Sequence, residues 1–493
     1  MTKITSSIAH RAAGAILGSA VGDAIGAPYE FGPARPQLSL AGTAADMSGN
    51  HTWEPGEWTD DTSMAVPTLR AAAAGLDLAG TEAQDDIVRD WSAWARDAKD
   101  VGIQTSQVFR GMRGDDAAAA VASARRVHDV AGRSGGNGSV MRTAPVGLAF
   151  MAEADGVARV ADAASAIAAL THYEDDARDG AALWSVLIHL AVRDGRVHVD
   201  DALAALPTER RERWARLLAE ADGADPDLFQ HNGWVVHAVQ AAYAAIRAAG
   251  IVLDDPATHT PTAFRRTIEQ AIRIHNDTDT VAAIAGALAG ALVGASAIPI
   301  GWQRLLHGHP GLGARELTRL AVLAVRGGVP DSSGWLTGEG VDYSGWPGRD
   351  ALAVHPHDDG VLIGGVGHLA DLPANIDAVV SLCRIGVREV PARIGPSDAA
   401  EVWLVDDANS GANMHLEFVL EEAADAVAAL RANGKRVYLH CVAAQSRTPT
   451  VAALYATRHL GVEPERALAE VMAALPAANP NEAFRAYLVG VAR

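Results

Sequence analysis

Apolar residues recur at a spacing near 3.6 through the first two thirds of the chain, and this period predicts helices. The segments concerned are also rich in Ala and other good helix formers. They cover residues 115–130, 157–170, 177–193, 233–249 and 262–275. The two-residue alternation of a half-buried strand is rare over residues 8–325. We therefore predict that residues 1–330 form an all-α domain.

The last third of the chain shows a different pattern, in which short β-rich runs alternate with helical segments. The runs are residues 361–363, 378–382, 402–405 and 436–439, and the helical segments are residues 417–433 and 448–460. Strands interleaved with helices predict an α/β domain with a mainly parallel sheet, which we place at residues 351–493. Residues 331–350 are rich in Gly, Asp and Ser and predict a linker. Trp335 and Trp346 suggest that this linker packs on another part of the protein.

Composition excludes some classes of protein. The length of 493 residues suits two to four domains, and a net charge of −19 argues against a broad basic surface for nucleic acid. Residues 281–300 are uncharged and long enough to span a bilayer, but their Ala and Gly content and the preceding Asp277 and Asp279 favour a buried helix. Two cysteines are too few for a disulfide framework. With no targeting segment recognised, we expect a cytoplasmic protein without a membrane partner.

Two short acidic motifs carry the first candidate chemistry. One is Thr59-Asp60-Asp61-Thr62, and the other is Asn276-Asp277-Thr278-Asp279-Thr280. Each adjoins an apolar or small-residue stretch, so their carboxylates need a partner when buried. Carboxylate and hydroxyl oxygens are the ligands that Mg²⁺ and Mn²⁺ prefer. The alternative is that Asp and Thr cap two helix N-termini. Because the motifs are far apart in sequence, a shared metal site would place the chain between them in one domain.

Three further motifs accompany the acidic ones. They are residues 14–31 (Gly-rich, with Gly22-Asp23 and Glu30), residues 136–142 (Gly-Asn-Gly-Ser-Val-Met-Arg) and Thr171-His172. In this order, the five motifs resemble those of the ADP-ribosylglycohydrolase family of the dinitrogenase-reductase-activating type. The resemblance covers roughly residues 8–325. It implies hydrolysis of the glycosidic bond between ADP-ribose and an acceptor, which is a modified protein or a small ADP-ribose compound.

The resemblance also implies roles for individual residues. Two Mg²⁺ or Mn²⁺ ions are expected on six ligands: Thr59, Asp60, Asp61, Asp277, Asp279 and Thr280. Glu30 matches an acidic residue that moves between the metals and solvent; the alternative is an exposed loop acid. Asn137, Gly138 and Ser139 match a cradle for an ADP-ribose phosphate, although an ordinary glycine turn would look similar. His172 matches a position beside the ligand, and the alternative is a histidine that ends a helix.

The second candidate chemistry is a Cys-x5-Arg segment, Cys441 to Arg447, between a predicted strand and a predicted helix. Backbone N–H groups of such a loop can converge on an anion, and Arg447 can hold two phosphate oxygens. The helix N-terminus and Arg447 both stabilise a thiolate, which is a nucleophile for phosphorus. The segment resembles that of the dual-specificity protein phosphatases over residues 350–493. Cys441 would be the nucleophile, and no cofactor is expected.

The same resemblance implies supporting roles. Thr448 matches a hydroxyl that steadies the thiolate, and the general acid is expected at Asp406 or Asp407, with Asp407 preferred by spacing. His440 is expected to orient the loop rather than act as a base. Ala444 stands where glycine is usual, so its Cβ crowds the loop or requires a positive φ. This departure keeps open the alternative that the domain binds phosphate and targets the hydrolase without efficient turnover on a phosphorylated substrate.

Overall fold

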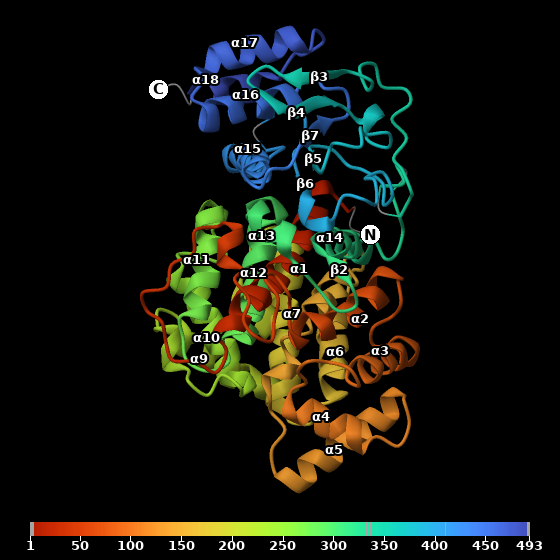
Figure 1. The fold of residues 1–493 in the computed structure, drawn as a ribbon. Helices are drawn as coiled ribbons and strands as arrows, with labels where there is room; N and C mark the ends of the chain where they lie inside the picture. Colours follow the sequence, from red (N-terminus) through yellow and green to blue (C-terminus); the bar gives the residue numbers. More distant parts are fainter. Residues whose placement is uncertain (1–3, 332, 336, 410, 491–493) are drawn as a thin grey trace. The chain divides into compact units, whose positions relative to one another are not determined.

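The chain divides into two compact units in the computed structural model, which describes residues 4–331, 333–335, 337–409 and 411–490 (Figure 1). One unit is formed by Met1–Ile298 and Leu305–Val329, and the other by Pro299–Arg304 and Pro330–Arg493. The segment predicted as a linker is therefore grouped with the second unit. Within it, Trp335 is buried and packs edge-on against Trp403, whereas Trp346 is exposed. The exact boundary between linker and domain stays a prediction.

The first unit is built of helices, as predicted. Its α-helices are α1 (Ser6–Gly26), α2 (Asp60–Ala73), α3 (Thr81–Trp94), α4 (Ile103–Gly111), α5 (Ala117–Ala131), α6 (Gly156–Ala169), α7 (Asp175–Asp194), α8 (Val199–Leu203), α9 (Thr208–Ala221), α10 (Val235–Ala248), α11 (Pro261–Ile272), α12 (Thr278–Val293) and α14 (Ala314–Val325). A two-stranded hairpin, β1 (His307–Gly308) and β2 (Leu312–Gly313), is the exception among its described residues. The short α13 (Ile300–Leu305) precedes the hairpin in the chain, but all of its residues except Leu305 belong to the second unit.

A face of small residues lets α1 and α12 pack unusually closely. Gly14, Gly18, Gly22 and Gly26 recur every fourth position of α1, which places them on one side of the helix. A Cβ on any of the first three would lie 2.2–2.3 Å from a backbone oxygen of α12, and one on Gly26 would lie 2.4 Å from the Asp279 Cα. The contacts run antiparallel, so the end of α1 meets the beginning of α12. The acidic motif at the start of α12 is positioned by this contact.

The uncharged stretch at residues 281–300 is a buried helix only in part. α12 ends at Val293, and Gly294 follows with a φ of +79°, so the chain turns before residue 300. All sixteen residues of α12 are buried. Among the described residues, no helix is long and apolar enough to cross a membrane.

The second unit contains a five-stranded sheet in the order β3-β4-β7-β5-β6. The strands are β3 (Leu352–His355), β4 (Asp358–Gly365), β5 (Ala378–Ser381), β6 (Ala399–Glu401) and β7 (Val437–Cys441). The pairs β4–β7, β7–β5 and β5–β6 are parallel, and β3 pairs antiparallel with β4. The helices are α15 (Leu416–Ala432), α16 (Arg447–Leu460), α17 (Pro464–Ala474) and α18 (Glu482–Gly490).

Two features of this sheet differ from the prediction. The prediction of a strand at residues 402–405 is wrong, because the ladder of hydrogen bonds ends at Glu401 in the described part of the chain. Val402 N–H still donates to the Ser381 carbonyl at 2.9 Å, but Leu404 N–H donates to the Val402 carbonyl at 2.9 Å, and this local turn replaces the ladder. The edge strand β3 was missed. It is short, and two of its four residues are exposed, so it lacks the apolar run of a buried strand.

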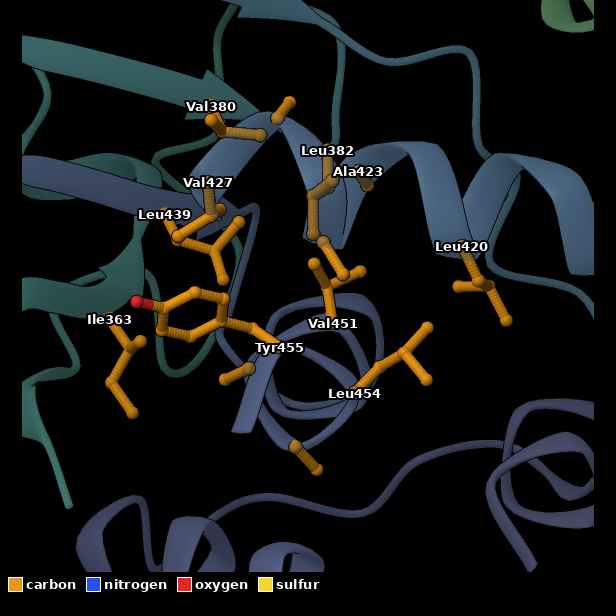
Figure 2. Packing of buried hydrophobic residues seen from close by; sticks show 14 of the residues in the cluster. Ile363, Val380, Leu382, Leu420, Ala423, Val427, Leu439, Val451, Leu454 and Tyr455 are labelled. Atoms are coloured by element: carbon orange, nitrogen blue, oxygen red, sulfur yellow. The ribbon is translucent and has the colours of Figure 1, made fainter. Parts of the chain in front are cut away.

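The core of the second unit lies between the parallel strands and two helices. Figure 2 shows Ile363, Val380 and Leu439 of the sheet close to Val427 of α15 and Val451 of α16. Cys441 and Ala444 belong to the same buried cluster. The loop that connects β7 to α16 is therefore anchored in the core at both of these residues.

Candidate metal centre and cysteine loop

Asp23, near the end of α1, fixes the start of α2. Its carboxylate accepts hydrogen bonds from the Thr59 N–H at 2.8 Å, the Thr62 N–H at 3.0 Å and the Thr62 hydroxyl at 2.6 Å. Burial raises the pKa of Asp23 to about 6, although these hydrogen bonds oppose the rise. No role was predicted for Asp23 from the sequence. The feature that could have identified Asp23 is that it is the only charged residue between positions 12 and 29 of the sequence.

Two groups of carboxylates meet where α1 ends and where α2 and α12 begin. One oxygen each of Asp23, Asp61 and Asp279 lie within 4.8 Å of one another, and one oxygen each of Glu30, Asp277 and Asp279 do the same. Asp279 belongs to both groups. The structure thus brings Asp61 of the first acidic motif together with Asp277, Asp279 and Glu30, and it adds Asp23. The predicted ligand Asp60 belongs to neither group.

The protein does not compensate the charge of this cluster. Asp61 Oδ1 and Asp277 Oδ1 are buried without a hydrogen-bond partner. Burial, followed by neighbouring carboxylates, raises the pKa of Asp61 and of Asp279 well above its ordinary value. No Arg or Lys in the described part of the chain forms an ion pair with these carboxylates. Orphaned oxygens in a set of hard donors fit a divalent cation such as Mg²⁺ or Mn²⁺.

The capping alternative does not describe these motifs. Thr59 is the N-cap residue of α2 and Asp277 that of α12, yet neither side chain bonds to its own helix N-terminus. The Thr59 hydroxyl instead donates to Asp61 Oδ2 at 3.2 Å, and the Thr280 hydroxyl donates to the same oxygen at 3.4 Å. The predicted threonine ligands therefore lie beside the carboxylates.

Glu30 is held beside the second acidic motif by the backbone. The next residue, Phe31, has a φ of +53° and its N–H donates to the Asn276 carbonyl at 2.7 Å, while Asn276 has a φ of +67°. Two non-glycine residues in left-handed backbone mark a strained junction of the kind found at functional sites. Burial, followed by the charges of Asp277 and Asp100, raises the pKa of Glu30 to about 8.

Asp60 lies at the side of the cluster nearest the loop that precedes α4. Its Oδ2 accepts a hydrogen bond from the Gly102 N–H at 3.3 Å. Burial, followed by the Asp100 charge, raises the pKa of Asp60 to about 7. Asp100 was not predicted as a site residue. It stands in an ordinary polar loop sequence, so only its position in the fold reveals it.

The glycine motif joins this cluster through Asn137. The short 3₁₀ helix Asn137–Ser139 places the Asn137 amide so that it donates to Asp277 Oδ2 at 2.7 Å and to the Asn232 carbonyl at 2.9 Å. Asn232 also donates to the Asp277 carbonyl at 3.2 Å, a partner that sequence reasoning missed. The Ser139 hydroxyl donates to the Gly136 carbonyl at 2.9 Å. The side chains of Asn137 and Ser139 thus form hydrogen bonds with other residues of the protein.

His172 is buried against the same loop. Its ring would lie 3.0 Å from a Cβ on Gly136 and 3.2 Å from one on Gly138, so glycine leaves room for the imidazole. Its Nδ1 lies 2.7 Å from the Thr171 hydroxyl. Burial, followed by the Arg142 charge, lowers the pKa of His172 well below its ordinary value. The structure therefore places His172 under the predicted cradle.

In the second unit, β7 ends at Cys441 and α16 begins at Arg447, so the predicted strand-loop-helix arrangement is present. Arg447 Nη1 donates to the carbonyls of Leu382 at 2.7 Å and Leu404 at 3.2 Å. Its Nε lies 3.7 Å from Asp406 Oδ2. The Thr448 hydroxyl donates to the Gly364 carbonyl at 3.3 Å rather than to the sulfur.

The two candidates for the general acid are placed differently. Asp406 approaches Arg447 and accepts a hydrogen bond from Asn481 at 3.0 Å. Asp407 accepts from the N–H and amide of Asn409, which is a local turn. The contacts therefore bring Asp406, and not the preferred Asp407, next to the loop arginine. The residue carrying this role stays a prediction.

His440 and Ala444 complete the description of the loop. The His440 Nε2 lies 2.7 Å from the Ser381 hydroxyl and its ring stacks on Tyr438, while burial lowers its pKa to about 4. A buried, neutral histidine suits the orienting role that was predicted. Ala444 is fully buried with a φ of +53°, which is the left-handed backbone that glycine adopts more readily. The positive φ, which was one of the two predicted consequences of alanine at this position, is therefore present.

The chain belongs to the ADP-ribosylglycohydrolase family, whose model matches residues 5–331. Human ADP-ribosylhydrolase ARH3 is 26% identical over 338 residues, which are 60% of this chain and 89% of that protein. The ADP-ribosyl-[dinitrogen reductase] glycohydrolase of Rhodospirillum rubrum is 28% identical, over 60% of this chain and 90% of its own. The ADP-ribosylarginine hydrolase Tri1 of Pseudomonas putida (strain GB-1) is 28% identical, over 59% and 73% respectively. These matches support a hydrolase of this family's type.

Two of the similar solved structures each cover part of the chain. An ADP-ribosylglycohydrolase-related protein complex covers 66% of this chain and all of its own, with 25% identity and a TM-score of 0.48. Human DUSP28 covers 29% of this chain and 94% of its own, with 21% identity and a TM-score of 0.25.

Proposed function

We propose that the first unit is a metal-dependent hydrolase that releases ADP-ribose from an acceptor. The observation that carries this proposal is the pair of carboxylate groups that share Asp279 and leave buried oxygens without partners. Asp23, Asp61 and Asp279 would hold one cation, and Glu30, Asp277 and Asp279 the other, with Thr59, Asp60 and Thr280 beside them. Bound there, Mg²⁺ or Mn²⁺ would supply Lewis acidity that makes a water more acidic.

The protein's own groups would orient the reactants. Asn137 holds Asp277 in place through its amide. The Gly136–Ser139 loop adjoins this carboxylate through Asn137, and its backbone would bind a phosphate of ADP-ribose. Glu30 immediately precedes Phe31, whose N–H bonds to the Asn276 carbonyl, so its carboxylate would be held next to the second acidic motif. Hydrolysis at the ribose carbon would break the bond to the acceptor, and water would supply the oxygen of the released sugar.

The substrate is proposed to be an ADP-ribosylated protein or a small ADP-ribose compound. The relatives include proteins named for ADP-ribosylarginine and for ADP-ribosylated dinitrogen reductase. A panel of Arg-linked, Ser-linked and nucleic-acid-linked ADP-ribose and ADP-ribose 1″-phosphate, each with Mg²⁺ or Mn²⁺, tests the proposal. Release of ADP-ribose from one substrate is expected. No release from any substrate with either metal would contradict the proposal.

We further propose that the second unit is a cysteine-dependent phosphatase. The supporting observation is the loop between β7 and α16, with Cys441 at its start and Arg447 at the first position of the helix. The chemistry would be attack of the sulfur on phosphorus, with departure of the substrate oxygen as a hydroxyl after protonation by Asp406 or Asp407. Water would then break the sulfur–phosphorus bond, which releases phosphate and restores the thiolate. Turnover of p-nitrophenyl phosphate that is lost in Cys441→Ser is expected. Separate Asp406→Asn and Asp407→Asn variants identify the acid.

A second candidate for this unit is a phosphate-binding module that targets the hydrolase. The left-handed backbone of Ala444 favours it, because a strained loop can bind an anion without closing fully around a reacting phosphoryl group. Native protein that binds phosphate but does not turn over p-nitrophenyl phosphate would select this candidate over the phosphatase.

A further inference from the structure

Arg142 is a fully buried cation at the end of the glycine motif. Its guanidinium lies 4.1 Å from the centroid of the Trp91 ring, and Nη2 donates to the Thr171 hydroxyl at 2.6 Å. Burial lowers the pKa of Arg142 to about 9, so the group remains charged at neutral pH. A guanidinium can only donate hydrogen bonds. The Thr171 oxygen is therefore an acceptor in this contact.

The hydrogen bonds of the Thr171 hydroxyl determine which ring nitrogen of His172 carries a proton. Thr171 is fully buried, and its hydroxyl contacts Arg142 Nη2 and His172 Nδ1. If His172 Nδ1 carried a proton and donated it to Thr171, the buried Thr171 hydroxyl proton would have no acceptor among the described residues. The protein would then bear the desolvation penalty of that unpaired hydroxyl. The hydroxyl therefore donates to Nδ1. Because His172 is also held neutral, its one ring proton is on Nε2.

The Nε2 atom of His172 faces the glycine loop. It would lie 3.0 Å from a Cβ on Gly136 and 3.4 Å from one on Gly138. His172 is only 2% exposed, yet in the described part of the chain this nitrogen has no hydrogen-bond acceptor. Nε2 is not fully enclosed, so it lies at the accessible edge of an otherwise buried ring. An N–H there without a protein partner, facing a loop of small residues, is available to a ligand atom.

We propose that Arg142 and Thr171 are positioning residues that hold His172 as the Nε2–H tautomer, so that it donates a hydrogen bond to an anionic oxygen of a ligand at the Gly136–Ser139 loop. This inference rests on the proposed function for the identity of that ligand, ADP-ribose. The other neutral tautomer would turn a lone pair toward the same oxygen and repel it. We call Arg142, Thr171 and His172 the relay. Through Thr171, the buried charge on Arg142 determines that His172 Nε2 is a hydrogen-bond donor in the binding site.

Nitrogen-15 spectroscopy of histidine-labelled full-length protein tests the tautomer without any ligand. The His172 signals are identified by their loss in His172→Gln. In the native protein, Nε2 is expected in the range of a protonated ring nitrogen and Nδ1 in that of an unprotonated one. In Thr171→Val, the two signals should move toward a mixture of tautomers. Native protein with its proton on Nδ1 would overturn the proposal.

Calorimetric binding of ADP-ribose tests the consequence. Thr171→Val is expected to weaken binding about tenfold, the effect of one hydrogen bond in a buried site, whereas Thr171→Ser should stay within about twofold. Thr267→Val is the matched control, because Thr267 is equally buried but its hydroxyl donates within α11 to the Ala263 carbonyl. The control should bind as native protein does.

A double-mutant cycle separates the relay from a general loss of structure. The amide of His172→Gln can still donate near the position of Nε2 but does not depend on a tautomer. In that background, Thr171→Val should change the affinity by less than about twofold. A loss as large as in the native background would overturn the relay. Native protein that neither binds ADP-ribose nor releases it from any substrate would instead overturn the proposed function, and the tautomer would still be decided by the spectrum.

Discussion

The acidic cluster of the helical unit and the cysteine loop of the α/β unit both concentrate charge, but they compensate it in different ways. In the cysteine loop, Arg447 is anchored by two backbone carbonyls and approaches Asp406, so the cation of this loop is supplied by the chain. In the acidic cluster, Asp61 and Asp277 keep buried oxygens without partners. A site that is incomplete without an outside cation should depend on metal, and a site that holds its own cation should not.

The comparison is tested most strongly by removing one charge from the cluster. Asp61→Asn or Asp279→Asn should lower hydrolase activity on the order of 100-fold or more, because changes to residues that merely support metal ligands already cost 10- to 100-fold. The metal-free variant should melt at a higher temperature than metal-free native protein, since one repelling carboxylate is gone. Kinetics and thermal unfolding with and without Mn²⁺ measure both effects.

The matched control is Asp200→Asn, which neutralises an exposed carboxylate of α8. It should leave hydrolase activity and the melting shift caused by Mn²⁺ unchanged. Phosphatase activity should be unchanged in all three variants. If Asp61→Asn and Asp279→Asn both kept native activity and native metal affinity, the assignment of the cluster as a metal centre would be wrong.

Chemical reagents should separate the two sites. EDTA is expected to reduce ADP-ribose release by more than about tenfold while sparing phosphatase activity, because metal binding is reversible and the cysteine loop needs no metal. Iodoacetamide should have the opposite effect by alkylating Cys441. Cys383→Ala is the control, since burial raises the pKa of the Cys383 thiol and makes it unreactive, so this variant should keep the same sensitivity. Loss of both activities with one reagent would contradict the separation.

A smaller effect is expected at Ala444. Its positive φ costs about 1 kcal/mol relative to glycine, and Ala444→Gly removes that cost while increasing the freedom of the unfolded chain. We expect turnover of p-nitrophenyl phosphate to rise severalfold, with little change in stability. The neighbouring Ala443→Gly, at a residue without positive φ, should not accelerate turnover. A fast native enzyme that Ala444→Gly does not improve would remove the strain argument.

The smallest expected effect is on the pH dependence of stability. Burial raises the pKa of Asp23 to about 6 and that of Asp60 to about 7 in the metal-free protein. A carboxyl with a raised folded pKa stabilises the protein fully below its unfolded pKa, near 4, and this contribution is lost as pH rises through the folded pKa. The melting shift caused by Mg²⁺ should therefore grow by a few degrees between about pH 5 and about pH 8.

The difference in melting temperature between metal-free and metal-loaded protein separates the contribution of these carboxylates from that of other titrating groups. Buried histidines such as His189, whose pKa falls to about 4, change stability in the opposite direction with pH, but they do so in both forms. Asp61→Asn should reduce the pH dependence of the difference. A melting shift that is the same at both pH values would contradict the raised pKa values of the cluster.

The sequence by itself determined the helical unit, the alternating strands and helices of the second unit, and the two acidic motifs. These features follow from local periodicity and from residue chemistry, which need no knowledge of the fold. The Cys441–Arg447 spacing is of the same kind, because one short loop contains the nucleophile and the arginine. The strand expected at residues 402–405 failed because a local turn, which periodicity does not report, replaces the ladder.

Only the tertiary structure decided which distant side chains share a site. Asp23 became part of the cluster because glycines let α1 lie against α12, and Asp100 and Asn232 came from loops whose sequences carry no signal of their own. Arg142 and Thr171 belong to two of the sequence motifs, but only the fold shows that Arg142 contacts Thr171 and that Thr171 contacts His172 Nδ1. Periodicity reports which face of an element is buried, whereas a site depends on which faces meet.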